Sequence, residues 1–225
     1  MMVGDSLFTL INSSQTTKKG VALYGQATYT IHKNLNITVG LRNDYEQQTQ
    51  SVIGYYQHDP SPANYIIFPD TLAKINFSAL SPKLSLDYKI KNSLLYASYN
   101  KGFRTGGLST LSSDPTQPPL NGYKPEHSNN FEIGLKNDFL DKKLRINIVA
   151  FYTHVTDAQV PTLQLPDAIV VTKNTGKLNS KGIEAEILTT PVKGLVLQYN
   201  IGYTKAIFES LNLAQQGSIV NLDGK

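Results

Sequence analysis

One stretch of the sequence carries residue types that bind phosphate. The segment YASYNKGFRTGG, residues 96–107, begins as an alternating strand and ends in two glycines close to Arg104. A glycine-rich loop that cradles phosphate is followed by a helix and ends in Lys-Ser or Lys-Thr. Here Gly106 and Gly107 are followed by LSTLSSDP, which is typical of a loop. The stretch therefore predicts a strand that runs into a loop, and not a nucleotide site.

Arg104 and a group of aromatic residues are the candidates for ligand contacts. Arg104 either meets an anionic ligand or forms an ion pair with an acidic loop residue, and the ion pair is the commoner use of such an arginine. The segment QQTQSVIGYYQHDPSPANYIIFPD holds the aromatic candidates Tyr55, Tyr56, His58, Tyr65 and Phe68. Their rings either stack on a planar ligand or fold this long segment on itself.

The other reactive side chains form no catalytic or metal-binding pattern. The histidines are scattered, and none has a second ligand at metal-binding spacing. They are His32, His58, His127 and His154. No Ser/His/Asp order stands out, and the carboxylate pair Glu184 and Glu186 is explained more simply by ion pairs across strands. Because there is no cysteine, disulfides and cysteine nucleophiles are excluded. The sequence predicts no catalytic residue, no metal ligand and no cofactor.

Composition limits the classes of partner. Lys and Arg number 21 against 17 Asp and Glu, without a polybasic run, so no nucleic-acid partner is indicated. The longest apolar runs, such as Ile66-Ile67-Phe68, are far shorter than the roughly 20 residues of a spanning helix. The beginning, MMVGDSLFTLINSS, lacks the basic region of a signal peptide. We therefore expect either a cytosolic protein or a sequence whose true start is missing.

Strict alternation of apolar and polar residues predicts eight strands in four hairpins. We expect them at residues 21–31, 35–46, 77–88, 94–104, 129–139, 144–155, 181–190 and 195–208. Short turns join the strands within each hairpin, whereas long polar segments separate the hairpins, near residues 47–75, 104–127 and 156–177. A soluble sandwich has turn signals every 8–12 residues. Short turns at one end and long loops at the other are typical of a transmembrane β-barrel.

The two faces of the predicted strands differ in charge. The apolar faces carry only Lys101 and Lys205, both near the ends that lead into long loops, whereas the polar faces are rich in charge. A Lys or Arg facing lipid at the membrane midplane costs about 2–4 kcal/mol, so the apolar faces should meet lipid. The expected lipid-facing residues include Leu84, Leu86, Ile146, Ile148, Leu197 and Ile201. Aromatic residues near both strand ends indicate two interfacial girdles.

Three blocks of sequence carry a family resemblance. They are SPKLSLDY and LLYASYNKGFRTGG within residues 81–107, YKPEHSNNFEIGLKNDFLDKKLRINIVAFYTHVTDAQV at residues 123–160, and NTGKLNSKGIEAEI at residues 174–187. Their order and spacing resemble the barrel of TonB-dependent outer-membrane receptors over about residues 20–208. Among these, the iron-complex receptors of the pesticin-receptor-like branch are the most similar.

The resemblance implies an all-β fold. This is an antiparallel transmembrane β-barrel meander, a fragment of a 22-stranded barrel that an N-terminal domain plugs. Residues 1–225 are expected to be a partial barrel domain of about eight strands, without the plug domain, the first strands and the C-terminal closing strand. The implied location is the outer membrane of a Gram-negative bacterium.

The resemblance also implies a function, namely active import of ferric siderophores or similar metal chelates. The implied partners are outer-membrane lipid, the TonB energy-transducing complex through segments absent here, and the chelate itself. Arg104, Tyr55, Tyr56 and His58 are then candidate contacts to the chelate. Because the chelator supplies the iron ligands, no metal ligand from the protein is implied. The alternatives are a passive porin, a barrel enzyme such as a protease or phospholipase, and a soluble all-β binding domain.

Overall fold

The computed structural model describes residues 8–58, 64–109, 122–164, 169–215 and 218–221. Strands make up nearly all of these residues. They are β1 (Phe8–His32), β2 (Leu35–His58), β3 (Asn64–Ile90), β4 (Ser93–Arg104), β5 (Gly107–Leu108), β6 (Gly122–Tyr123), β7 (Glu126–Phe139), β8 (Leu144–Gln164), β9 (Ile169–Thr189), β10 (Leu197–Gln215) and β11 (Ser218–Asn221).

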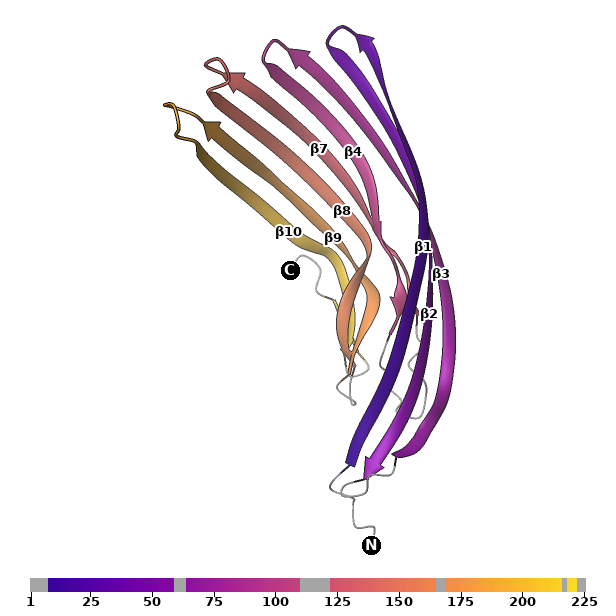
Figure 1. Cartoon of the computed structure of the whole chain (residues 1–225). Coiled ribbons are helices and arrows are strands. Elements are labelled where there is room, and N and C mark those ends of the chain that lie inside the picture. Colours follow the sequence, from indigo (N-terminus) through magenta and orange to yellow (C-terminus); the bar gives the residue numbers. More distant parts are fainter. Residues whose placement is uncertain (1–7, 59–63, 110–121, 165–168, 216–217, 222–225) are drawn as a thin grey trace.

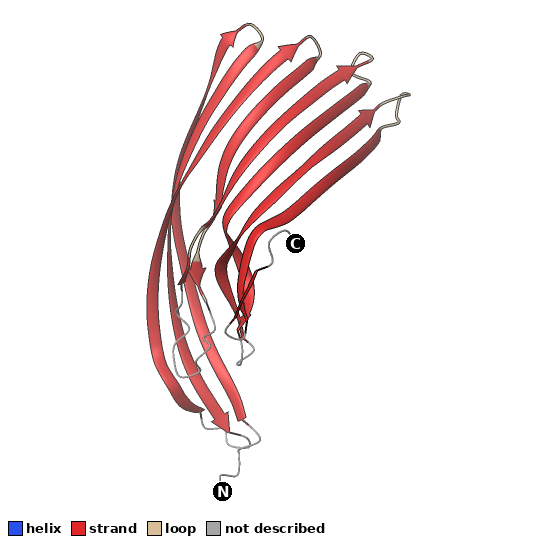
Figure 2. Cartoon of the chain, turned by 180° about the vertical axis from the view of Figure 1, so that it is seen from behind, coloured by secondary structure: helices blue, strands red, loops and turns tan. Residues whose placement is uncertain are grey.

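Nine of these strands form one antiparallel meander, in the order β1-β2-β3-β4-β7-β8-β9-β10-β11. The sheet bends into a trough that is open between β1 and β10, with the short turns gathered at one end (Figure 1). Figure 2 shows the same curved sheet from behind, with strands throughout and loops only at the ends. The chain therefore has the predicted all-β, antiparallel barrel architecture, and over the described residues the barrel is not closed.

The predicted strands are all present, but two of the predicted loops are wrong in part. Residues 47–58 continue β2, and residues 64–75 belong to β3, with Thr49 opposite Lys74 in register. In the same way β8 and β9 extend through most of residues 156–177. In these extensions apolar and polar residues do not alternate strictly, as in QQTQ at residues 47–50 and YIIF at residues 65–68, so they lack the pattern that identified the other strands. The strands continue here because their backbones keep pairing with the neighbouring strand, past the part of the sheet with an apolar outer face.

The register places like residues in rows across the sheet. Lys136 of β7 is opposite Asn147 of β8, which is opposite Glu186 of β9, which is opposite Asn200 of β10. The neighbouring row on the other face holds Leu135, Ile148, Ala185 and Ile201. One face of the sheet is thus polar and charged, and the opposite face is apolar.

The polar face is the inner, concave one. Side chains from β4, β7, β8, β9 and β10 line a single hollow on it, which requires strands that curve toward that side. The Lys83 Nζ of β3 also reaches the Gln26 Oε1 of β1 at 3.5 Å, across the intervening β2. The expected lipid-facing residues all lie on the opposite, outer face, where Leu86 is 43% and Ile201 57% exposed. Their contact with lipid stays a prediction.

Candidate ligand-binding face and its hairpin

The stretch around Gly106 is where the chain leaves the large sheet. After Arg104 it forms the β5–β6 hairpin, and it returns at Glu126, directly opposite Arg104. The hairpin packs on the inner face of β3: a Cβ added at Gly106 would lie 2.6 Å from Cε1 of Phe77. The buried apolar residues among those described are Val52, Phe77, Ala79, Leu108 and Ala158. The two glycines thus allow close packing, as expected for a strand that runs into a loop.

Two amide side chains hold the base of this hairpin. The Gln159 Nε2 of β8 donates to the carbonyls of Thr105 at 2.9 Å and Lys124 at 3.1 Å, and its backbone N donates to Glu126 Oε2 at 2.7 Å. Asn174 of β9 accepts from the Lys124 N at 2.7 Å and donates back to the Lys124 carbonyl at 2.9 Å. The Asn174 amide therefore pairs with Lys124 as a neighbouring backbone would.

Sequence reasoning did not identify Gln159 or Asn174 as functional residues. Both lie inside the resemblance blocks, Asn174 at the start of NTG, but the pattern of a block does not state which backbone its amide will meet. The contacts join segments about 50 residues apart, so only the fold reveals them.

Arg104 stands at the entrance to the hairpin with its side chain exposed. Its carbonyl accepts from Gln159 Nε2 at 3.4 Å, and within the described ranges its guanidinium forms no ion pair. A cation is thus available on the inner face at this level. Its contact with ligand remains a prediction.

The aromatic candidates lie on strands rather than in a loop. Tyr56 of β2 is opposite Tyr65 of β3, with ring centroids 6.4 Å apart, so here the segment does pack on itself. Tyr55 is its neighbour in sequence and points to the opposite face. His58 is the last residue of β2, opposite Phe8, and its side chain lies outside the described part.

The structure does not bring these aromatic residues to Arg104. Lys83 is opposite Asn100, which puts the end of β4 level with about residue 79 of β3. Tyr65 lies further along β3 by the length of residues 65–79, about 45 Å at roughly 3.3 Å per residue. Figure 1 shows the ends of β1, β2 and β3 extending far beyond the end of β4. The two groups of candidates therefore cannot form one compact site.

Between the hairpin and the short turns, the inner wall carries a hollow of about 510 Å³, and its lining includes Tyr96, Lys136, Asn147 and Glu186. The Tyr96 hydroxyl of β4 hydrogen-bonds to Glu132 of β7, and Lys136 Nζ lies 5.4 Å from the centroid of its ring. A Cβ at Gly134 would overlap this ring, which explains the FEIG sequence of residues 131–134: the glutamate takes the hydroxyl and the glycine leaves room for the ring. Tyr96 thereby lies flat against the wall.

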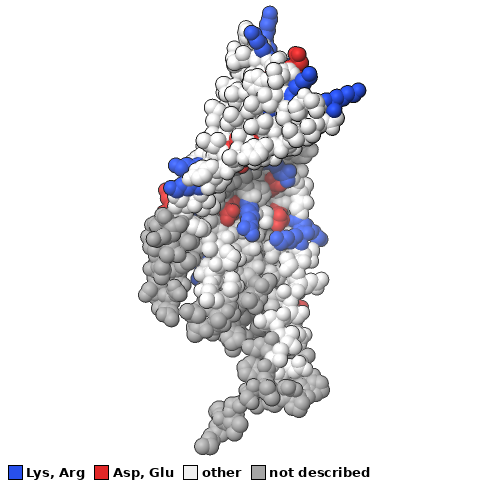
Figure 3. All heavy atoms as spheres, turned by 90° about the vertical axis from the view of Figure 1, so that its left-hand side faces the viewer, with Lys and Arg blue, Asp and Glu red and all other residues white. Residues whose placement is uncertain are grey.

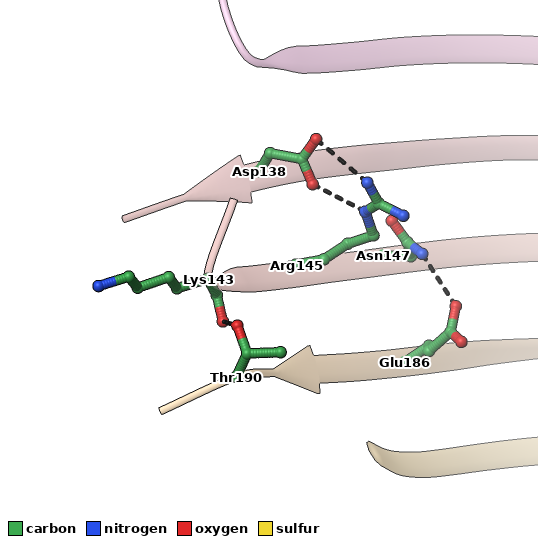
Figure 4. A network of polar contacts seen from close by, with 6 residues as sticks. All are labelled: Asp138, Lys143, Arg145, Asn147, Glu186 and Thr190. Carbon is green, nitrogen blue, oxygen red and sulfur yellow. Dashed lines mark hydrogen bonds and ion pairs between the residues drawn. The ribbon is translucent and has the colours of Figure 1, made fainter. Parts of the chain in front are cut away.

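Glu186 was expected to form ion pairs across the strands, and this was wrong for the described residues. Its carboxylate accepts from Asn147 Nδ2 at 2.9 Å and from Gln198 Nε2 at 3.1 Å, both of them neutral amides. The ion pair of this region lies closer to the turn, where Arg145 Nε contacts Asp138 Oδ1 at 2.7 Å. Figure 4 shows Asp138 on β7, Arg145 and Asn147 on β8, and Glu186 on β9.

The charges are unevenly distributed along the trough. At the short-turn end, a hollow of about 610 Å³ is lined by basic side chains, namely Lys89, Lys91, Lys136, Lys142 and Arg145, together with Asp138. Figure 3 shows cationic side chains at the tips of the short turns and a mixture of both signs at mid-height. Among the described residues there is no group of His, Asp and Glu that could hold a metal ion, and no helix long and apolar enough to cross a membrane.

A curved antiparallel meander with a polar inner wall narrows the choice of family, and a sequence comparison decides it. The family of TonB dependent receptor-like beta-barrels matches residues 3–224. The chain belongs to this family. It is a family of transport receptors.

Solved structures of such receptors share the fold of this barrel. The ferric yersiniabactin uptake receptor FyuA from Yersinia pestis is 20% identical, with a TM-score of 0.73 over 88% of this chain and 28% of its own. The siderophore receptor PiuA from Acinetobacter baumannii is 18% identical, with a TM-score of 0.66 over 92% of this chain and 28% of its own.

A third receptor is similar to the same degree. The ferric-catecholate import receptor Fiu from E. coli K12, in its closed form, is 18% identical, with a TM-score of 0.65 over 91% of this chain and 30% of its own. The chain thus spans less than a third of the length of these receptors.

Proposed function

We propose that this chain is part of an outer-membrane importer of ferric siderophores or similar metal chelates, driven through TonB, in a Gram-negative bacterium. The observation that carries the proposal is the match of the receptor-barrel family to residues 3–224. The structural neighbours named for siderophore uptake support the class of ligand. The blocks within residues 81–187 favour the iron-complex, pesticin-receptor-like branch.

The geometry fits passage of a polar complex along the trough. The inner wall offers amides, carboxylates and a lysine around Tyr96, all suited to hydrogen bonding with a ligand or with a plug domain. The β5–β6 hairpin lies against the inner face of β3, toward the end of the sheet where long connections join the strands, so it narrows the entrance to the trough at that end. Arg104 provides an exposed cation there for an anionic chelate. The chelator holds the iron, so the barrel itself needs no metal ligands.

The outer face argues against a soluble binding domain. Large apolar side chains are exposed in continuous rows on it, such as Ile133, Ile183 and Tyr203 at 54%, 57% and 69%. Such rows on a soluble domain would favour aggregation. In a membrane they face hydrocarbon, as they do in transmembrane barrels.

Uptake of radiolabelled iron tests the proposed function. A strain without the gene of the receptor that carries this barrel would be supplied with ferric catecholate, hydroxamate and phenolate siderophores, with and without TonB. We expect uptake of at least one chelate to require both the receptor and TonB. Uptake that needs the receptor but persists without TonB would indicate a passive porin, and no difference for any chelate would exclude a chelate importer.

A further inference from the structure

Two lysines face each other on the outer, apolar face of the sheet, where Lys181 is present in addition to the expected Lys101 and Lys205. Lys181 of β9 is directly opposite Lys205 of β10, and both side chains are exposed. Residues opposite each other in this way have Cβ atoms about 4.5–5.5 Å apart, and two like charges there repel. Within the described part of the chain, neither lysine has an ion-pair partner. The pair thus has a cost that an anion would remove.

The position of this pair along the strands is marked by aromatic rings. In register, Tyr99 is opposite Phe131, Phe131 is opposite Tyr152, and Tyr152 is opposite Lys181. The ring centroids of the first two are 5.1 Å apart, and those of Phe131 and Tyr152 are 6.4 Å apart. A continuous aromatic row on the outer face of a barrel marks the border between hydrocarbon and water. Lys181 and Lys205 complete this row.

The hydrogen bonds of the tyrosines show which side of the row is polar. Tyr99 Oη donates to Asn129 Oδ1 at 2.9 Å, and Tyr152 Oη donates to Asn179 Oδ1 at 3.0 Å, both toward the long-connection end. The acid on that side, Glu209, lies 3.8 Å from His154 and accepts from Asn179, so it is engaged elsewhere.

The other side of the lysine pair is apolar. Ile183 and Tyr203 follow the two lysines on the same face, and they are 57% and 69% exposed. A molecule that contacts both the lysine pair and these two apolar residues needs an anionic group joined to an apolar body.

We propose that Lys181 and Lys205 bind the phosphorylated sugar headgroup of an outer-leaflet glycolipid, whose acyl chains lie over Ile183 and Tyr203. Two ammonium groups at cross-strand spacing match the charge of a phosphate, which lysine binds as a point charge. Their flexible stems let the ammonium groups reach the headgroup level from an apolar surface. The proposal rests on the proposed function in so far as that places the barrel in an outer membrane.

Binding of diphosphoryl lipid A to the intact receptor that carries this barrel tests the site. The purified receptor would be titrated with diphosphoryl lipid A in detergent, and the bound lipid counted by native mass spectrometry. Phosphatidylcholine would serve as the uncharged-headgroup comparison. The test variant is Lys181→Gln with Lys205→Gln. The matched control, Lys143→Gln with Lys193→Gln, removes the same charge from exposed lysines of the short turns.

We expect the test variant to bind diphosphoryl lipid A about tenfold more weakly or worse, and the control variant to bind as the unaltered receptor does. Arginine at both positions should restore binding. Equal affinity in test variant and unaltered receptor would overturn the proposal, as would an equal loss in the control. Should the double variant not assemble, Lys205→Gln alone is expected to weaken binding severalfold, and unchanged binding would again overturn it.

Iron uptake in the same variants separates this proposal from the proposed function. A receptor that imports no chelate but binds lipid A through the lysine pair would contradict only the importer. A receptor that imports a chelate but binds lipid A independently of the pair would contradict only the lipid site.

Discussion

Gln159 donates from one side-chain amide to backbone carbonyls on both sides of the β5–β6 hairpin, and Asn174 pairs with Lys124 as a strand would. At the scale of single residues, these two amides replace the backbone ladder where β4 and β7 separate. The Gln159 bonds are partly shielded from water, and a shielded carbonyl that loses its donor costs free energy, so these two amides contribute to the stability of the hairpin.

Gln159→Ala should therefore loosen the hairpin at a cost of about 1–3 kcal/mol while the barrel still assembles. Limited proteolysis of the receptor in membrane vesicles measures this, and cleavage within residues 104–126 should become faster. Gln198→Ala is the control, since the exposed Gln198 donates to Glu186 and lies on β10, away from the hairpin. Equal protease resistance in both variants would show that the amide does not hold the hairpin.

Gly106 makes a second prediction at this scale. An alanine Cβ there would overlap the Tyr123 carbonyl oxygen and lie 2.6 Å from the Phe77 ring, so Gly106→Ala should displace the hairpin or cost about 1–3 kcal/mol, as overpacking does. Gly25→Ala, where no atom lies within 4 Å of the added Cβ, should be neutral. Thermal unfolding followed by the heat-modifiable mobility of the receptor on gels compares the two. A neutral Gly106→Ala would mean that the hairpin does not pack on Phe77.

At the scale of strands, a strand can be predicted from the sequence where its two faces meet different surroundings, because apolar and polar residues then alternate. Ile201 and Asn200 differ in this way, and the alternation placed β10 within a few residues at its start. Where both faces are polar, as in Gln47–Gln50 of β2, the alternation is missing, and the sequence predicts a loop although the strand continues. The same limit applies to the site. The sequence predicts Tyr55, Tyr56, His58 and Arg104 as one set of ligand contacts, because alternation does not show how far β2 and β3 extend past the end of β4.

The faces themselves can be tested with adjacent residues of β10. Ile201 is 57% exposed on the outer face, so Ile201→Arg places a charge in lipid near the midplane and should cost about 2–4 kcal/mol. Asn200 lines the polar hollow on the inner face, so Asn200→Arg should be tolerated. The measurement is the amount of folded receptor in the outer membrane. Equal losses in both variants would show that the faces are assigned wrongly.

At the scale of the whole molecule, the sheet separates an apolar outer face from a polar inner face, and Arg104 belongs to the inner one. Because its exposed guanidinium forms no ion pair among the described residues, Arg104→Ala should leave assembly nearly unchanged. Uptake of the chelate per folded receptor should fall severalfold if the arginine attracts the anionic complex. The two quantities are measured in the same cells, with Lys193→Ala as a control for loss of one charge. Unchanged uptake would exclude Arg104 from the ligand path.

The unequal height of the strands has a consequence for what the cell presents to its surroundings. The ribbon of β1, β2 and β3 continues for about 45 Å along the strands past the level at which β4 ends, at roughly 3.3 Å per residue. If the barrel stands in an outer membrane as proposed, with its long connections outward, an antibody or a phage would meet the Tyr56–Tyr65 end of this ribbon before it meets Arg104. Recognition by other organisms and capture of a chelate would then act on different parts of the barrel, so the tip could change without altering the entrance.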